Sequence, residues 1–146
     1  MGGSHDDRGG STVPVDVNYF AVVVAIINLI LGFLWYGPLF GRQWMTYMNI
    51  TTPSRPDRAA MAKTTGGSFV GALVFASVLS LVVDWAQAAS AAAGIRVGFW
   101  AWLGFVATVT INSVLYERRP TGLWALNNAY YLLTYLIAGA LLAVWT

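Results

Sequence analysis

The sequence predicts an all-α fold, a bundle of four transmembrane helices. Of its 146 residues, 58% are hydrophobic and only 10% are charged, whereas a soluble domain carries about 25% charged residues. The charges also leave four long stretches free: 25 residues before Arg42, 20 before Asp84, 20 before Glu117 and 27 after Arg119. Each stretch reaches the ~20 residues that cross a hydrocarbon core ~30 Å thick.

The first predicted span covers about residues 17–37. We expect it to stop at Gly37-Pro38, because proline cannot continue the hydrogen-bond ladder of a helix. Residues 1–16 are polar and Gly-rich, and they are expected to form a flexible tail. Residues 42–63 contain TTPSRPDR and are expected to be mostly irregular, with the RQWMTYMNI segment lying along the membrane interface.

The other three spans are predicted over about residues 67–85, 97–116 and 122–145. The Ala-rich AQAASAAAG stretch is expected to prolong the second helix. The short ERRPTG connection makes the third and fourth helices antiparallel neighbours. Residues 17–146 are therefore expected to form one four-helix membrane domain.

The basic residues predict an orientation in the membrane. The first and third connections carry six of them, against Arg8 and Arg96 in the tail and second connection. Because cytoplasmic loops are enriched in Lys and Arg, both termini are expected outside. The tryptophans are expected near the two interfaces, with none at mid-span. The six basic residues are Arg42, Arg55, Arg58, Lys63, Arg118 and Arg119.

Composition excludes several chemistries. The chain has no cysteine, and its one histidine, His5, lies in the tail, so we expect no metal site and no cofactor. No paired carboxylates on one helix, nucleophile with a nearby base or phosphate-binding loop is present, so an enzyme is not expected. The net charge of +2 is interpreted as orientation and lipid contact rather than binding of nucleic acid.

A motif at the end of the first span carries a family resemblance. Residues 34–41 read LWYGPLFG and are followed by Trp44; a softer pattern runs from Gly104-Phe105-Val106 through Asn112 and Glu117 to the region of Asn127. Over roughly residues 17–146 the chain resembles a family of small bacterial four-helix membrane proteins, a domain of unknown function. The resemblance implies this fold in the bacterial cytoplasmic (inner) membrane, and it implies no activity or substrate.

Small and polar residues follow one face of the first helix, and Asn28 lies near the middle of it. An amide at that depth needs a partner, so Asn28 is either a clamp between helices, which we favour, or a contact to a ligand or ion. The face is formed by Asn18, Ala21, Ala25, Asn28, Gly32 and Trp35.

Polar stripes on the third and fourth helices predict a binding seam. Thr108 and Asn112 are four residues apart on the third helix, and so are Asn127 and Tyr131 on the fourth. Facing stripes form a seam that Asn28 can join. Such a seam either binds a small polar solute or water, or is a satisfied packing network, which we favour.

A charge cluster is predicted at the cytoplasmic ends of the helices, where Arg42 is placed to pair with Glu117. An ion pair or lipid-headgroup anchor is favoured there over a proton relay. The cluster consists of Arg42, Glu117, Arg118 and Arg119.

A small-residue face on the second helix predicts a homo-oligomer. Gly67, Gly71, Ala72 and Ala76 would allow close approach of a second copy within the lipid bilayer.

Two functions fit these patterns. The first is a small transporter or channel-like subunit that handles a small solute along the seam. The alternative is a structural or interaction module of the membrane, a scaffold or lipid-sensing subunit without a substrate of its own. A transporter should place the five seam residues around a hydrated cavity, whereas a scaffold should pair them in a dry seam.

Overall fold

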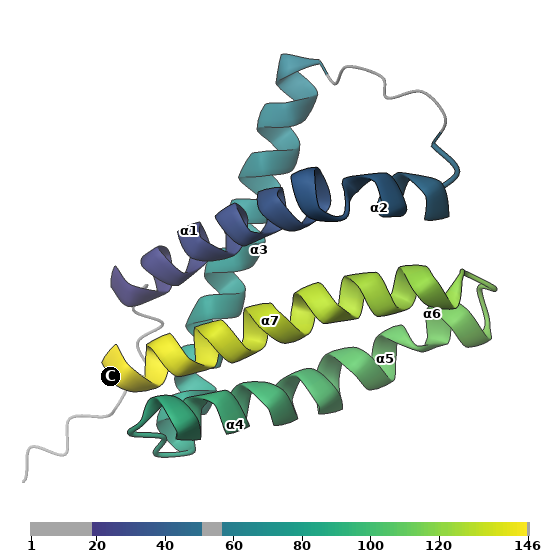
Figure 1. Cartoon of the computed structure of the whole chain (residues 1–146). Coiled ribbons are helices and arrows are strands. Elements are labelled where there is room, and N and C mark those ends of the chain that lie inside the picture. The colour runs from purple at the N-terminus through teal and green to yellow at the C-terminus, as the bar shows by residue number, and fades with distance from the viewer. Residues whose placement is uncertain (1–18, 51–56, 146) are drawn as a thin grey trace, which may run out of the picture.

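The computed structural model describes residues 19–50 and 57–145, and these residues are almost entirely helical, with no strand among them (Figure 1). Within these described residues, four helices are long and apolar enough to cross a membrane. The predicted all-α fold with four candidate spans is therefore confirmed. The predicted flexible tail lies outside the described residues. The four spans are Tyr19–Leu39, Arg58–Trp85, Ala91–Leu115 and Thr121–Trp145.

The first span does not stop before Pro38, contrary to the prediction. Helix α1 (Tyr19–Leu34) runs into a π-helical turn, η1 (Trp35–Leu39), and then into the short helix α2 (Gly41–Tyr47). Proline lacks an N–H and its ring crowds the preceding turn of an α-helix. The wider π turn accommodates Pro38, and the Phe40 N–H closes it by donating to the Trp35 carbonyl at 2.9 Å.

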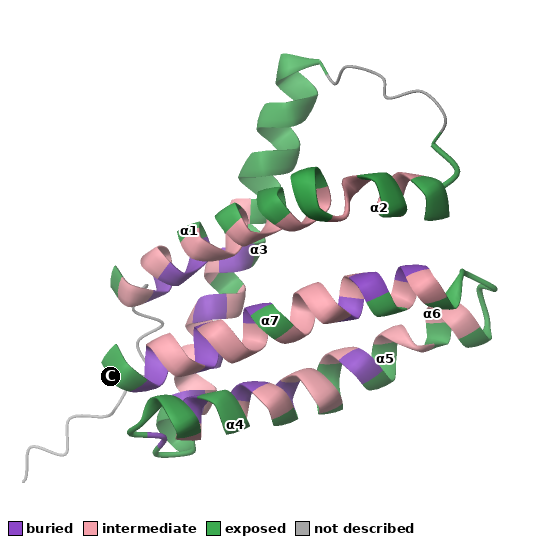
Figure 2. Cartoon of the chain, viewed as in Figure 1, coloured by how far each residue is buried: buried purple, intermediate pink, exposed green. Residues whose placement is uncertain are grey.

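Helix α3 (Arg58–Trp85) begins well before the predicted residue 67, so the expectation of a mostly irregular segment over residues 42–63 is wrong for its two ends. The absence of charge marks where a helix is apolar, not where it begins. Residues 58–63 read RAAMAK and are strong helix formers. They form a first part of α3 that is exposed on all sides (Figure 2).

The AQAASAAAG stretch does not prolong α3, again contrary to the prediction. The helix ends at Trp85, and Gln87 adopts the left-handed conformation with φ 51°. The Ala88 N–H then donates to the Val83 carbonyl at 3.1 Å, which closes the helix end. The Ser90 side chain accepts from the Ala93 N–H at 3.2 Å and caps the next helix, α4 (Ala91–Trp102).

The third span is built from several short pieces. Helix α4 continues through a π-helical turn, η2 (Leu103–Ala107), into α5 (Thr108–Thr110) and α6 (Asn112–Leu115). Because this span begins at Ala91, Trp102 lies near its middle. The expectation that no tryptophan lies at mid-span does not hold for this helix.

Helix α7 (Thr121–Trp145) runs back beside α4 as its antiparallel neighbour (Figure 1). Glycines make this approach close: a Cβ on Gly98 would collide with the Tyr135 carbonyl, and a Cβ on Gly139 with the Gly94 carbonyl. Small residues of this kind let helix backbones meet in lipid, where dispersion contacts replace the hydrophobic effect.

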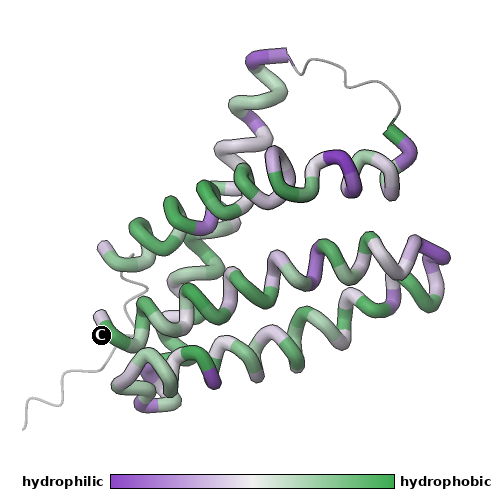
Figure 3. The backbone as a smooth tube through the Cα atoms, viewed as in Figure 1, coloured by the Kyte–Doolittle hydropathy of each residue, from purple (hydrophilic) through white to green (hydrophobic). Residues whose placement is uncertain are grey.

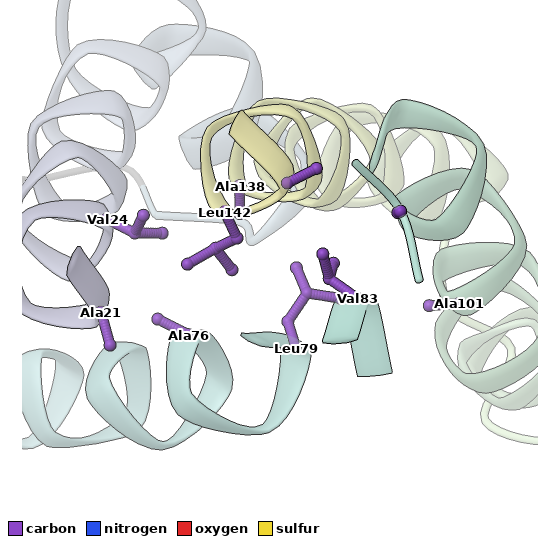
Figure 4. Packing of buried hydrophobic residues seen from close by; sticks show 10 residues of the cluster. Ala21, Val24, Ala76, Leu79, Val83, Ala101, Ala138 and Leu142 are labelled. Carbon is purple, nitrogen blue, oxygen red and sulfur yellow. The ribbon is translucent and has the colours of Figure 1, made fainter. Parts of the chain in front are cut away.

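The core lies where α3 crosses α1 and α7 (Figures 1 and 4). Ala21 and Val24 of α1 meet Ala76 and Leu79 of α3 and Leu142 of α7 in one cluster. Ala72 is buried as well. The face predicted for a second copy is therefore divided: Ala72 and Ala76 face inward, while Gly67 and Gly71 face open space. The homo-oligomer stays a prediction.

Large apolar side chains cover much of the outer surface, such as Ile30, Val74 and Phe105. The most hydrophilic residues lie mostly near helix ends and connections (Figure 3). With four spanning helices, this distribution is that of a multi-pass membrane protein whose sides face lipid.

Candidate functional site: a polar cavity at one end of the bundle

A cavity of about 480 Å³ lies between α2, the α5–α6 segment and the first half of α7. It is at the end of the bundle where α2 ends and α7 begins (Figure 1). Amide, hydroxyl and indole groups alternate with apolar side chains around it. The lining residues are Trp44, Met48, Val109, Thr110, Asn112, Ser113, Glu117, Arg119, Leu123, Trp124, Asn127, Asn128 and Tyr131.

Three of the five predicted seam residues line this cavity: Asn112, Asn127 and Tyr131. Thr108 does not; it is exposed, and its hydroxyl donates to the Gly104 carbonyl of its own helix at 2.7 Å. The π turn η2 precedes Thr108 directly. Thr108 and Asn112 both follow this turn, and the helix is interrupted between them at Ile111, where α5 ends and α6 begins. A four-residue spacing therefore does not mark one face across this break.

The fifth predicted seam residue, Asn28, lies away from the cavity in a packed contact between α1 and α7. Its Oδ1 accepts hydrogen bonds from the Tyr130 hydroxyl at 2.8 Å and the Thr134 hydroxyl at 3.2 Å. Gly32 lies one turn further along α1, where the Tyr130 hydroxyl comes within 3.0 Å of an added Cβ. This arrangement is a clamp between helices, with both lone pairs of the Asn28 oxygen in use.

The inner wall of the cavity is a closed hydrogen-bond network. The Thr110 hydroxyl donates to the Val106 carbonyl at 2.7 Å and accepts from Trp124 Nε1 and Asn128 Nδ2, each at 3.1 Å. Asn128 is only 3% exposed, and its Nδ2 also donates to the Trp124 carbonyl at 3.1 Å. Because each of these polar groups has a partner, the wall is rigid and needs no water.

Sequence reasoning missed this network. It considered only one stripe of α7, through Asn127 and Tyr131, although α7 packs against both α1 and the α4–α6 side. The neighbouring amide of Asn128 points to that second side. A pair of adjacent asparagines in an apolar helix was the available signal that α7 has two partners.

The π turn η1 contacts α7 next to the cavity, at Leu126 and at the lining residue Asn127. The Tyr36 hydroxyl, on the π turn η1, donates to Asn127 Oδ1 at 2.8 Å. One residue earlier, Trp35 Nε1 donates to the Leu126 carbonyl at 3.3 Å. The Tyr36 ring also lies 5.3 Å from that of Tyr130, edge to face. The proline-induced turn thus places two aromatic donors against α7 at the cavity.

The bond from Tyr36 uses only the oxygen of the Asn127 amide. Its oxygen is occupied, while its Nδ2 makes no side-chain hydrogen bond within the described part of the chain. Asn127 therefore offers N–H donors beside the cavity.

One ion pair lies at the mouth of the cavity. Arg119 Nε is 3.4 Å from Glu117 Oε2, both side chains are at least half exposed, and both line the cavity. Of the predicted charge cluster, Arg42 and Arg118 do not line it, and within residues 19–50 and 57–145 Arg42 forms no ion pair with Glu117. Arg118 instead forms the left-handed residue of the connection, with φ 55°. The same described residues bring together no group of three side chains that could hold a metal ion.

Fold and cavity together define a class: a four-helix, multi-pass membrane protein with a polar cavity at one end. The chain belongs to the family described as "Protein of unknown function (DUF1761)", which matches residues 19–143. The resemblance to an uncharacterised family is confirmed by this match, which covers the four helices. No curated protein and no solved structure matches the chain.

Proposed function

We propose that this protein is a small transporter or channel-like subunit of the bacterial cytoplasmic membrane that binds a small solute in the cavity. One observation carries the proposal: a cavity of about 480 Å³ lies among apolar spanning helices and is lined by Asn112, Asn127 and Tyr131. That volume lies within the ~300–1,000 Å³ of small-molecule sites. A membrane protein needs no polar cavity for packing alone.

The lining favours neutral polar or anionic solutes. Asn127 Nδ2 and the Arg119 guanidinium are donors, and Asn112 and Tyr131 can donate as well. The only acidic group of the lining, Glu117, is already paired with Arg119. The lining therefore offers a cation no net negative charge, and its many N–H and O–H donors favour acceptor groups on the solute.

Passage beyond the cavity requires the wall of Thr110, Trp124 and Asn128 or the bond from Tyr36 to Asn127 to open. The second is the weaker barrier, because a single polar contact between helices in a membrane contributes about 0.6 kcal/mol. We therefore assign the gate to Tyr36 and Asn127. With both termini outside, the mouth at Glu117 and Arg119 faces the cytoplasm.

The alternative, a scaffold or lipid-sensing module without a substrate, has support from two packed hydrogen-bond networks of the bundle. The contact of Asn28 with Tyr130 and Thr134 and the network around Asn128 are satisfied and closely packed. Both arrangements serve stability alone. Neither accounts for the open space at Asn112 and Tyr131, and for this reason the transporter is preferred. Neither function includes a catalytic step.

Solute flux in liposomes separates the two. Purified wild-type protein is expected to pass at least one member of a panel of small anions, neutral solutes and water. Asn112→Leu should abolish that flux, and Asn127→Leu, which removes both a donor of the cavity and the acceptor of the gate bond, should alter it, while both proteins still assemble. Thr108→Leu is the matched control for Asn112→Leu, because Thr108 lies on the same span but outside the cavity. If no member of the panel passes, the transporter is contradicted and the scaffold function is favoured. Asn127→Leu should then only reduce the yield of purified protein and weaken its capture of a partner.

A further inference from the structure

A second concave surface lies on the opposite end and side of the molecule, between α3 and α4. These helices diverge from the turn at residues 86–90, because α3 packs mainly on α1 and α7 whereas α4 packs mainly on α7 (Figure 1). Two hollows of about 570 Å³ each lie in the opening. They share Val82, Ala101 and Phe105, so they form one continuous groove.

The inner part of this groove is apolar. Val74 and Val78 form its wall on α3 and are 58% and 54% exposed. Leu79 and Ala101 lie at its base, and the only polar side chain of this part is Tyr135. A small polar solute would find almost nothing to bind here, whereas a hydrocarbon chain would bury apolar surface on two sides.

The end of the groove near the turn is different. Arg96 lines it and is the only charged residue to do so among residues 19–50 and 57–145. Within the described part of the chain, Arg96 forms no ion pair. Gln87 and Trp100 flank it, and an indole next to a cation is typical of the headgroup region of a membrane. This end is therefore suited to an anionic group.

The length of the groove fits one leaflet of a bilayer. Along α3 it extends from Gly71 to Ala86, which at 1.5 Å per residue is about 22 Å. Half of a bilayer, headgroups included, is about 20–22 Å thick. A positive charge at the interfacial end and an apolar path of this length together match the shape of a single lipid molecule.

We propose that the α3–α4 groove binds a glycerophospholipid, with its phosphate at Arg96 and one acyl chain running past Phe105 to Gly71. This site is separate from the cavity at the other end of the bundle and does not depend on the function proposed for it. The lipid occupies the space between the diverging helices α3 and α4, and so holds the two helices at a fixed angle.

Native mass spectrometry in a mild detergent, with phosphatidylglycerol added, tests the site. Gly71→Leu fills the inner end of the groove, and Gly67→Leu is its matched control. A Cβ at either glycine meets no atom within 4 Å, so the two positions are matched in local space, but only Gly71 lines the groove. Arg96→Gln removes the cation.

The wild type and Gly67→Leu are expected to retain one phosphatidylglycerol, and Gly71→Leu to lose it. Arg96→Gln should bind about fivefold more weakly, which corresponds to the ~1 kcal/mol that a basic residue contributes near anionic lipid. The wild type should bind diacylglycerol, which lacks the phosphate, as weakly as Arg96→Gln binds phosphatidylglycerol. Inorganic phosphate added without lipid should not remain bound to the protein.

Three results would overturn the proposal. Equal lipid retention by Gly71→Leu and Gly67→Leu would show that the lipid lies elsewhere. If Arg96→Gln bound phosphatidylglycerol as tightly as the wild type does, the lipid phosphate would not lie at Arg96. A dimer that both glycine variants convert to monomer, with no lipid bound to the wild type, would make this face a contact between copies of the chain.

Discussion

The Tyr36 hydroxyl donates a 2.8 Å hydrogen bond to Asn127 Oδ1, joining residues 91 positions apart in the sequence. The bond ties the π turn at the end of α1 to the wall of the cavity on α7. Tyr36 owes its position to Pro38, whose missing N–H widens the turn. A local backbone irregularity thus sets the geometry of the candidate gate.

Tyr36→Phe should lower the stability of the protein slightly. The substitution removes only the hydroxyl, so the expected loss is about 0.6 kcal/mol and at most ~1.7 kcal/mol, as for other polar contacts between membrane helices. Thermal melting in detergent measures it. Tyr116→Phe is the control, because Tyr116 is 82% exposed and should melt as the wild type does. If both variants melt alike, the bond does not hold α1 to α7.

Asn28→Leu should cost more than Tyr36→Phe, about 1–2 kcal/mol, because the Thr134 hydroxyl loses its acceptor on α1 and the Tyr130 hydroxyl keeps only the longer contact, 3.3 Å, to the backbone carbonyl of residue 28. Thr134 is buried, so its hydroxyl cannot turn to water. Unfolding in a denaturing detergent measures the difference from Ile30→Leu, a neighbouring exposed position. Equal tolerance of both changes would mean that the clamp contributes nothing.

Gly98→Ala should separate α4 from α7, because the new Cβ would occupy the position of the Tyr135 carbonyl. Overpacking of this kind costs about 1–3 kcal/mol. Gly104→Ala provides the comparison on the same span, since a Cβ there meets no atom within 4 Å. The melting temperature of Gly98→Ala should be clearly lower than that of Gly104→Ala. A Gly98→Ala protein as stable as Gly104→Ala would contradict the close contact of these helices.

The orientation is tested with enzyme fusions. Alkaline phosphatase joined after Trp145 should be active, because six basic residues in the first and third connections, against two elsewhere, keep those connections in the cytoplasm. A fusion within the connection at Glu117 should be inactive. An inactive C-terminal fusion that is folded and present in the membrane would reverse the topology.

The four spans could be predicted because charge is so costly in a bilayer that its absence alone reveals them. The ends of the helices could not. Charges tolerated near water hid the early start of α3 at Arg58, and the left-handed Gln87 broke a stretch whose composition favours helix.

The cavity was predicted in part. Asn112, Asn127 and Tyr131 follow from a four-residue spacing, and they do share the cavity. Thr108 was misplaced because a regular helix was assumed from Thr108 to Asn112, where the chain is interrupted at Ile111 between α5 and α6. Asn28 was assigned to the same seam because the spacing of residues within α7 does not reveal which of its faces meets α1 and which meets the α4–α6 side. Only the three-dimensional arrangement separates its contact with Tyr130 from the network at Asn128.

The most direct test of the account is the access of water to the cavity. The chain has no cysteine, so single cysteines can be introduced without further changes and labelled in nanodiscs with a hydrophilic thiol reagent. Asn112→Cys and Tyr131→Cys should react within about tenfold of the rate of Arg58→Cys, at the exposed start of α3, because a thiol reacts as its thiolate, which needs water.

In the same measurement, Asn28→Cys in the packed clamp and Thr108→Cys on the outer face should stay unlabelled. Labelling at positions 112 and 131 with protection at 28 and 108 is the result that a solute-binding cavity predicts. Protection at all four positions would contradict it, since the amides and hydroxyls at this end of the bundle would then belong to a dry packing network.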